Sequence, residues 1–176
     1  DVAALLTNGA TADDAGYAAL LAAAEAAGAP VLVAQPGQRI DLGNGARLDI
    51  LSAGGDAGMT DNDASVVARL SYGALSVLLT GDAGEAAEAA LLAGRQLSPT
   101  VVLKAGHHGA NTSSGAAFLA AVRPQVIVIS AGADNSYGHP APAMLARAAE
   151  IGATVLRTDE VGTIEVSSDG ERMWWE

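Results

Sequence analysis

The second half of the chain alternates short apolar runs with helical patterns, and this alternation constrains the fold more than any other feature. The apolar runs are residues 74–80, 100–103, 125–130 and 154–157, and the helical patterns between them are residues 84–94, 114–122 and 142–151. Strands that alternate with helices of about ten residues are typical of βαβ units and of parallel sheets. We therefore predict a parallel sheet with helices outside it. The run 74–80 is almost wholly apolar, which favours a central strand covered on both faces.

The first half is expected to form antiparallel hairpins. Residues 39–42 and 47–52 are separated by Gly43-Asn44-Gly45, and residues 65–72 meet residues 74–80 at Tyr72-Gly73. Such glycine-containing pairs are strong hairpin signals. The remaining segments expected are strands at residues 2–7 and 31–34, a helix at 13–27 capped by Asp13 or Asp14, a glycine- and aspartate-rich loop at 53–63, and a last hairpin of 163–166 with 172–175. We find no linker or repeat, so the interpretation is one α/β domain over residues 1–176.

Composition limits what the chain can do. Its 176 residues suit one domain, and with 3% aromatic residues the core must be built from Val, Leu, Ile and Ala. The formal net charge of −11 argues against non-specific nucleic-acid binding, which needs a basic surface. The absence of cysteine excludes disulfide partners, zinc-thiolate sites and cysteine nucleophiles. No apolar run is long enough to span a bilayer. Because the chain begins at Asp1 rather than Met, we expect a piece of a longer protein.

Polar side chains that can bind metal follow three successive predicted strands. Asp82 comes after the run 74–80, His107 and His108 follow the run 100–103, and His139 follows the run 125–130. The carboxyl ends of parallel strands meet at one edge of a sheet, where ligands gather. Carboxylate oxygen and imidazole nitrogen are ligands that zinc and manganese accept without cysteine. The sequence therefore predicts a metal site at this edge.

Each of these residues also has a purely structural interpretation. Asp82 directly precedes a predicted helix and can be its N-cap. The His-His-Gly sequence can be a turn whose rings cover a sheet edge, and His139-Pro140 can simply open the last helix. The metal-site prediction depends on all of them occurring together on successive strand ends.

Three motifs resemble signatures of the ComEC-type branch of the metallo-β-lactamase superfamily. They are LLTGDA at residues 78–83, VLKAGHHGANTSS at 102–114 and SAGADNSYGHPAP at 130–142. The segments DNDASVVARLSYG at 61–73 and LRTDEVGTIEV at 156–166 are also similar to that branch. The GD and KxxHHG elements occur in other members, including phosphorylcholine esterases, whereas NxYGHP discriminates better. The resemblance runs from about Arg39 to the end of the chain.

The resemblance implies a role for each matching residue. Asp82 and His108 are expected to bind the metal, either zinc or manganese, which a complete site would hold as a pair of ions. His107 and His139 are expected to act on the substrate, with His139 as a transition-state donor or general acid, although the sequence leaves open which of His107 and His108 is the ligand. The expected substrate-binding residues are Lys104, Asn111, Ser113, Asn135 and Tyr137.

The chain departs from the superfamily pattern in two places. The HxHxDH motif, which supplies most of both metal shells, is absent because no histidine precedes His107. The middle ligand histidine has no counterpart, and Asn62 occupies its neighbourhood. The expected fold is therefore a metallo-β-lactamase αββα sandwich that is incomplete on its N-terminal side. We expect an exposed edge or apolar face near residues 2–7, with oligomerisation or marginal stability as its consequence.

The resemblance implies a metal-dependent hydrolase, specifically a phosphodiesterase or nuclease that acts on DNA, in single-stranded form, during competence-related uptake. The membrane channel of the same parent protein would be its partner, and the domain would lie on the extracytoplasmic face of a bacterial membrane. The incomplete metal shell predicts that this chain alone is inactive or impaired. Two alternatives remain open. One is a small phosphoester hydrolase related to phosphorylcholine esterases, and the other is a metal-free binding or scaffolding remnant.

Overall fold

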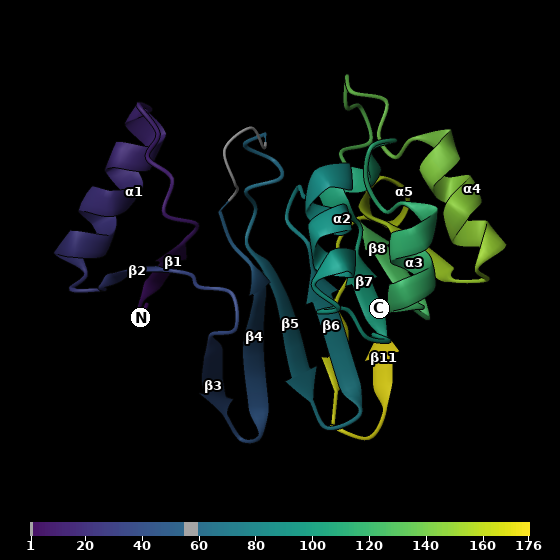
Figure 1. Cartoon of the computed structure of the whole chain (residues 1–176), viewed down its shortest axis with the longest axis horizontal. Coiled ribbons are helices and arrows are strands. Elements are labelled where there is room, and N and C mark those ends of the chain that lie inside the picture. Colours follow the sequence, from purple (N-terminus) through teal and green to yellow (C-terminus); the bar gives the residue numbers. More distant parts are fainter. Residues whose placement is uncertain (1, 55–59) are drawn as a thin grey trace.

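The computed structural model describes residues 2–54 and 60–176 of the chain. Its largest element is a seven-stranded mixed sheet with the strand order β3-β4-β5-β6-β7-β8-β9, so neighbouring strands follow one another in the sequence. Two small sheets of two strands each, β1-β2 and β10-β11, complete the structure (Figure 1). The α/β class predicted from the sequence is therefore confirmed.

The antiparallel half of the large sheet consists of β3 (Arg39–Gly43), β4 (Ala46–Ser52), β5 (Val67–Tyr72) and β6 (Leu75–Leu79). Both predicted hairpins are present, since β3 pairs with β4 and β5 pairs with β6, each antiparallel. Asn44 and Gly45 both adopt positive φ angles, of 53° and 83°, as a two-residue hairpin turn requires. Of the predicted loop at 53–63, residues 55–59 lie outside the described residues.

The parallel half begins at β6, which pairs antiparallel with β5 and parallel with β7. The strands β7 (Val102–Lys104), β8 (Val126–Ile129) and β9 (Thr154–Arg157) continue it in parallel. The connecting helices are α2 (Glu85–Ala93), α3 (Ala116–Val122) and α4 (Pro142–Glu150). The parallel sheet predicted from the alternation of strands and helices is therefore present.

The main core lies between the parallel strands and their helices. Leu103, Ile127 and Ile129 from the strands and Phe118 and Leu119 from α3 are all 0–1% exposed. They pack in one cluster of buried residues with Leu78, Leu91, Val122 and Met144. The prediction that the run 74–80 is covered on both faces was wrong. β6 is central in the sheet, but alternate side chains point to opposite faces, and Leu79 remains 39% exposed.

Residues 2–34 form a small layer, which we call the N-terminal unit, and its Leu6 and Ala34 pack with Ile50 and Ala68 of the large sheet. It consists of β1 (Leu5–Thr7), α1 (Ala15–Ala26) and β2 (Val31–Val33), with β1 and β2 paired in parallel. Asp14 caps α1 by accepting a hydrogen bond from the Tyr17 amide at 3.0 Å. The exposed apolar surface expected near residues 2–7 is present, because Val2 is 64% exposed and all three residues of β2 are 44–49% exposed. In Figure 1 this unit stands apart from the helices that cover the parallel strands.

The C-terminal segment contains α5 (Thr158–Val161) and the hairpin of β10 (Val166–Ser168) with β11 (Met173–Trp175). A hairpin was predicted here, but its first strand begins at Val166, where the predicted strand ended, and Val166 pairs with Trp175. The four-residue helix α5 was not predicted. No helix in the described part of the chain combines the length and apolar character that a bilayer span requires.

Candidate functional site

The loops that follow β6, β7 and β8 lie together at one end of the sheet, the upper end in Figure 1. The first of these loops carries Asp82. Gly81 precedes it with a φ of +55°, and a Cβ atom there would lie 2.8 Å from the Ser65 side chain, so only glycine fits. The Ser65 hydroxyl accepts a hydrogen bond from the Asp82 amide at 3.0 Å. The segment before β5 therefore fixes the backbone of Asp82, while its side chain remains 38% exposed.

Asp82 is not the N-cap of α2. The N-cap residue is Gly84, and the capping acceptor is Asp63, whose Oδ1 accepts hydrogen bonds from the amides of Gly84 and Ala87 at 3.0 and 3.2 Å. Asp63 is buried, and the hydrogen bonds from Thr60 and from these amides hold its pKa below the ordinary value although burial, the largest influence, opposes this. The structural interpretation of Asp82 is therefore wrong, because another residue satisfies the helix end and leaves the Asp82 carboxylate free.

The second loop holds the two histidines in an unusual backbone conformation. His107 and His108 both have positive φ angles, of 45° and 55°, within a 3₁₀ turn over Gly106–Gly109. Such angles are uncommon for residues other than glycine and cluster at functional sites. Gly106 lets this turn approach the first loop closely, since a Cβ atom there would lie 2.6 Å from the Ala83 carbonyl oxygen.

His108 faces Asp82 across the gap between the two loops. Its Nε2 lies 3.6 Å from Asp82 Oδ1, and its Nδ1 lies 2.7 Å from the Ser130 carbonyl oxygen. Because a carbonyl can only accept, Nδ1 carries a proton, and Nε2 is the ring nitrogen that lies near Asp82. This arrangement is common for a metal-binding histidine, whose other nitrogen donates to a backbone carbonyl. The geometry favours His108 as the ligand of the pair.

His107 points to a different set of neighbours. Its two ring nitrogens lie 3.4 and 3.5 Å from Nδ2 of Asn62, and its ring meets that of His139 edge to face at 5.6 Å between centroids. Burial lowers the pKa of His139 below its ordinary value, and the neighbouring His107 and His108 lower it further. Both influences favour the neutral form of His139, and its Nδ1 is buried with no hydrogen-bond partner among the described residues.

Three of the predicted substrate-binding residues lie around the histidine loop. Lys104 is largely buried, and its Nζ donates to the carbonyl oxygens of Gly81 and Ala105 at 2.8 and 3.0 Å. The hydroxyl of the buried Ser113 donates to the carbonyl oxygen of Gly106 at 2.6 Å. Asn111 is exposed. The structure thus uses Lys104 and Ser113 to hold the loops together, and a contact of any of the three with substrate stays a prediction.

The segment after the histidines is held from both sides. Glu88 of α2 accepts hydrogen bonds from the amides of Ser114 and Gly115, and Arg147 of α4 donates to the carbonyl oxygens of Asn111, Ser113 and Ser114. Burial raises the pKa of Glu88 above its ordinary value, and the two amides oppose this. The histidine loop is therefore part of a rigid scaffold.

The third loop surrounds a hollow beside His108 with a volume of about 260 Å³. Asn135 fixes this loop: its Oδ1 accepts from the His139 amide, and its Nδ2 donates to the carbonyl oxygens of Gly132 and His139. Tyr137 is 81% exposed, and its ring stacks on that of His139 at 6.0 Å and 18°. The residues that line the hollow are His108, Ser130, Ala131, Gly132, Asn135, Tyr137 and His139.

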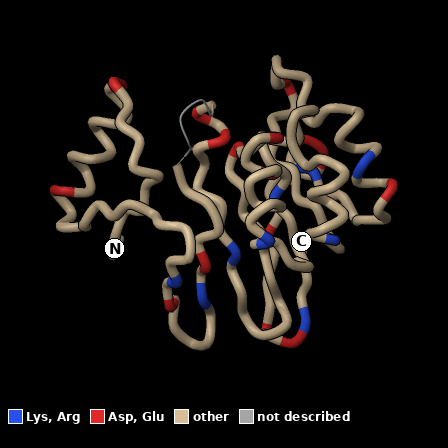
Figure 2. The backbone as a smooth tube through the Cα atoms, viewed as in Figure 1, with Lys and Arg blue, Asp and Glu red and all other residues tan. Residues whose placement is uncertain are grey.

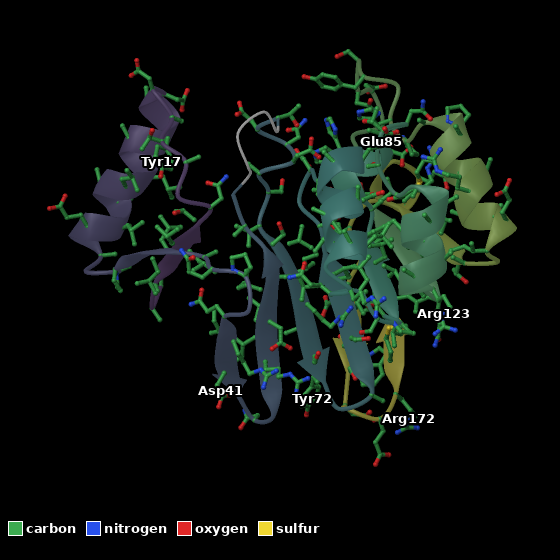
Figure 3. The ribbon with its side chains drawn as sticks, in the orientation of Figure 1. Tyr17, Asp41, Tyr72, Glu85, Arg123 and Arg172 are labelled. Carbon is green, nitrogen blue, oxygen red and sulfur yellow. The ribbon has the colours of Figure 1, made fainter. Side chains whose placement is uncertain are left out.

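A second hollow of about 370 Å³ lies on the other side of the histidine loop. Its lining residues include Asn62, Asp82, Glu85 and His107. Lysine and arginine are missing from the lining of both hollows as the described residues form them. Figure 2 shows acidic but no basic segments at the loop tips of this end. In Figure 3, Glu85 lies at this end, whereas Arg123 and Arg172 lie toward the opposite one.

Asp82 and His108 fit a metal ion as two of its ligands. A tetrahedral zinc with bonds of about 2.0–2.2 Å separates two ligand atoms by roughly 3.4 Å, close to the 3.6 Å between Asp82 Oδ1 and His108 Nε2. A catalytic zinc takes three protein ligands. Within residues 2–54 and 60–176, no group of three or more acidic, histidine or cysteine side chains is placed to bind one ion. The pair therefore has the spacing of two metal ligands and lacks a third among the described residues.

Asn62, Asp63 and Ser65 contribute to this site but were not predicted as site residues. All three precede β5, and they contact His107, the N-terminus of α2 and the Asp82 amide, respectively. Only the Asn-x-x-Ser pattern at 62–65 hinted at them. No local rule connects Asp63 with a helix that begins 22 residues later, because N-caps are normally adjacent to their helix.

No protein-family model matches the chain. Among curated proteins, it is 41% identical over 108 residues to Competence protein ComA of Neisseria gonorrhoeae, and 36% identical over 107 residues to ComE operon protein 3 of Bacillus subtilis. It is also 36% identical over 129 residues to Recombination protein 2 of Haemophilus influenzae. This chain is similar to one segment of competence proteins. The predicted similarity to proteins of competence is therefore confirmed.

The matched segments cover 60%, 59% and 73% of this chain. They cover only 15%, 13% and 16% of the three relatives, in the same order. The chain thus spans a small part of the length of the curated relatives that it matches.

Proposed function

We propose that the chain is part of a metal-dependent phosphodiesterase that acts on DNA during competence. The observation that carries this proposal is the pairing of Asp82 with His108, whose carboxylate oxygen Oδ1 and imidazole nitrogen Nε2 lie 3.6 Å apart. The similarity to proteins named for competence supports the setting. The proposal includes the metallo-β-lactamase sandwich as the complete fold, and a membrane-bound parent with this domain on its extracytoplasmic side.

Each residue at the site has a defined task in this proposal. Asp82 and His108 are two ligands of a divalent metal, zinc or manganese, which when bound supplies an activated water for attack on phosphorus. The Ser130 carbonyl orients His108, and the Ser65 hydroxyl orients Asp82. The first contact holds the ring of His108, and the second holds the backbone of Asp82, before an ion arrives.

His139 is suited to donate a hydrogen bond to the negative charge that develops in the reaction. Its pKa is lowered chiefly by burial, which favours the neutral imidazole. A buried N–H without an acceptor is costly, which favours the proton on Nε2 rather than on the buried Nδ1. An imidazole N–H held in a fixed loop can stabilise the negative charge of a transition state by donating a hydrogen bond to it.

A small phosphoester hydrolase is the second candidate, and the charge of the site favours it. The lining of the two hollows, as described, contains acidic residues but no lysine or arginine to neutralise the phosphates of a long strand. A small substrate needs fewer such contacts. A metal-free binding module is the third candidate, favoured by the shell of only two ligands.

Metal binding by the chain tests the proposal. We expect titration calorimetry with Zn²⁺ or Mn²⁺ to show binding that weakens at least about tenfold in Asp82→Asn and in His108→Asn, since even loss of an outer-shell partner weakens binding by that much. His107→Asn is the matched control, because His107 contacts Asn62 and His139 instead, and it should bind like wild type. No metal binding, or equal loss in His107→Asn, would contradict the assigned ligands and favour the binding module.

Substrate class is tested with manganese and two phosphodiesters, a single-stranded oligonucleotide and bis(p-nitrophenyl) phosphate. The parent protein and this chain are compared, each with an Asp82→Asn control. We expect the parent to cleave the oligonucleotide and this chain to be impaired, because it supplies only two ligands. Cleavage of the small diester but not of DNA would establish the second candidate instead.

A further inference from the structure

The hollow beside His108 carries an exposed aromatic side chain with no evident structural task. Tyr137 is 81% exposed, whereas the one phenylalanine of the chain, Phe118, is buried in the core. Its ring stacks on His139, which in turn meets His107 edge to face, so three rings run from the loop surface to the histidine pair. Offset-stacked rings leave the outer face of the last ring open to another flat ring.

We propose that this hollow binds a nucleobase, which stacks on the open face of Tyr137. The inference rests on the proposed action on DNA and specifies which part of the strand the site holds. Stacking on aromatic side chains is how single strands are bound without sequence preference, because every base offers a flat face. Since His108 lines the same hollow, a base bound there places the adjoining sugar-phosphate at the Asp82–His108 pair.

The loop is preorganised for this contact. Asn135 makes three hydrogen bonds inside it, to the His139 amide and to the carbonyl oxygens of Gly132 and His139, at 2.7–3.0 Å. The Ala141 amide donates to the Gly109 carbonyl oxygen at 2.9 Å, which ties the end of this loop to the histidine loop. A loop already held in place loses little conformational freedom on binding, so more of the stacking energy appears as affinity.

The charge of the site also favours a base over a phosphate as the bound group. The side chains described around the two hollows include Asp63, Asp82 and Glu85 and offer no exposed cation. Lys104, the only lysine of the chain, is partly buried, and its Nζ donates to two backbone carbonyls. Affinity that comes from stacking rather than from phosphate contacts depends only weakly on salt.

An NMR titration tests the inference without metal or turnover. The ¹⁵N-labelled chain is titrated in EDTA with 2′-deoxyadenosine 5′-monophosphate and, separately, with 2-deoxyribose 5-phosphate, which lacks the base. We expect shifts centred on residues 132–139 with the nucleotide and none of this pattern with the sugar phosphate. Tyr137→Ala should weaken nucleotide binding by about fivefold to 150-fold, the range that corresponds to loss of one base–aromatic stack.

Two further variants and a change of salt concentration test whether stacking is the cause of nucleotide binding. Tyr137→Phe keeps the ring and should bind within about threefold of wild type, as should Tyr17→Ala, whose tyrosine lies on α1 away from the site (Figure 3). Raising salt from 50 to 200 mM should change the affinity by less than about twofold. No nucleotide binding, equal shifts with the sugar phosphate, or wild-type affinity in Tyr137→Ala would overturn the base site. Failure of the metal titration would contradict only the proposed function, since this assay contains no metal.

Discussion

The N-terminal unit and the parallel half of the large sheet bury their apolar side chains very differently. In the N-terminal unit the buried residues are alanines, Ala24, Ala29 and Ala34, while the leucine and valines of β2 remain 44–49% exposed. In the parallel half, Leu103, Ile127 and large residues of α3 are essentially inaccessible to solvent. Buried area is the main source of stability, so the parallel half must supply most of it.

The candidate site lies on the better-packed of these two regions. Asp82, His108 and His139 all lie on loops that leave β6, β7 and β8, the well-packed strands. The N-terminal unit contributes a tether instead, in which Asn8 Nδ2 donates to the Ala64 carbonyl oxygen at 3.0 Å, beside Asn62 and Asp63. A site built on rigid elements holds its groups more accurately than one built on loosely packed ones.

The largest expected effect contrasts the two regions directly. Phe118→Ala should lower the free energy of unfolding by about 3–5 kcal/mol, because it empties a fully buried ring volume in the main core. Leu32→Ala, at a side chain that is 44% exposed, should cost less than about 1 kcal/mol. Urea unfolding followed by circular dichroism measures both. Comparable losses in the two variants would mean that the N-terminal unit is packed as tightly as the parallel half.

A smaller effect is expected where the segment before β5 caps α2. Asp63→Ala removes the acceptor of the Gly84 and Ala87 amides and should cost about 1–2 kcal/mol in unfolding free energy. The control is Asp61→Ala, an exposed aspartate two residues earlier, with a change within about 0.5 kcal/mol. An equal change in both variants would show that Asp63 does not serve as the cap.

The smallest effect concerns Glu88 and depends on pH. Because burial raises its pKa, the folded protein keeps this proton to higher pH than the unfolded chain does. Glu88 therefore contributes most to stability below its ordinary pKa of 4.5 and loses that contribution as the pH rises through the raised value. The cost of Glu88→Gln, about 1 kcal/mol or less, should be greatest near pH 4 and smaller at pH 7.

Thermal unfolding of Glu88→Gln at pH 4 and pH 7 checks whether its stability cost falls as the pH rises. Glu85→Gln, on the same helix, is the control. Glu85 is exposed, so its variant should leave the unfolding free energy within about 0.5 kcal/mol of wild type. A cost of Glu88→Gln that grows with pH would mean that the two amides of Ser114 and Gly115 outweigh burial.

Local signals predicted most of the elements. The Asn44-Gly45 turn specifies the hairpin of β3 and β4 through positive φ angles, and the spacing of apolar residues predicts α1, α2, α3 and α4 to within a few residues. The helix α5 was missed because four residues are too few to show a helical period. The start of β10 was misplaced because the pattern over 163–168 does not fix where pairing begins.

The sequence by itself determined the α/β class, the order of strands and helices, and the candidates Asp82, His108 and His139, because periodicity and strand-end position are written locally in the chain. The tertiary structure alone decided how these side chains are placed relative to one another. Asp63 caps α2 from a distant segment and so frees Asp82, and the Ser130 carbonyl turns His108 toward that carboxylate. Both contacts join residues about 20 positions apart, and only the packing of the strands beside one another brings them within hydrogen-bonding distance.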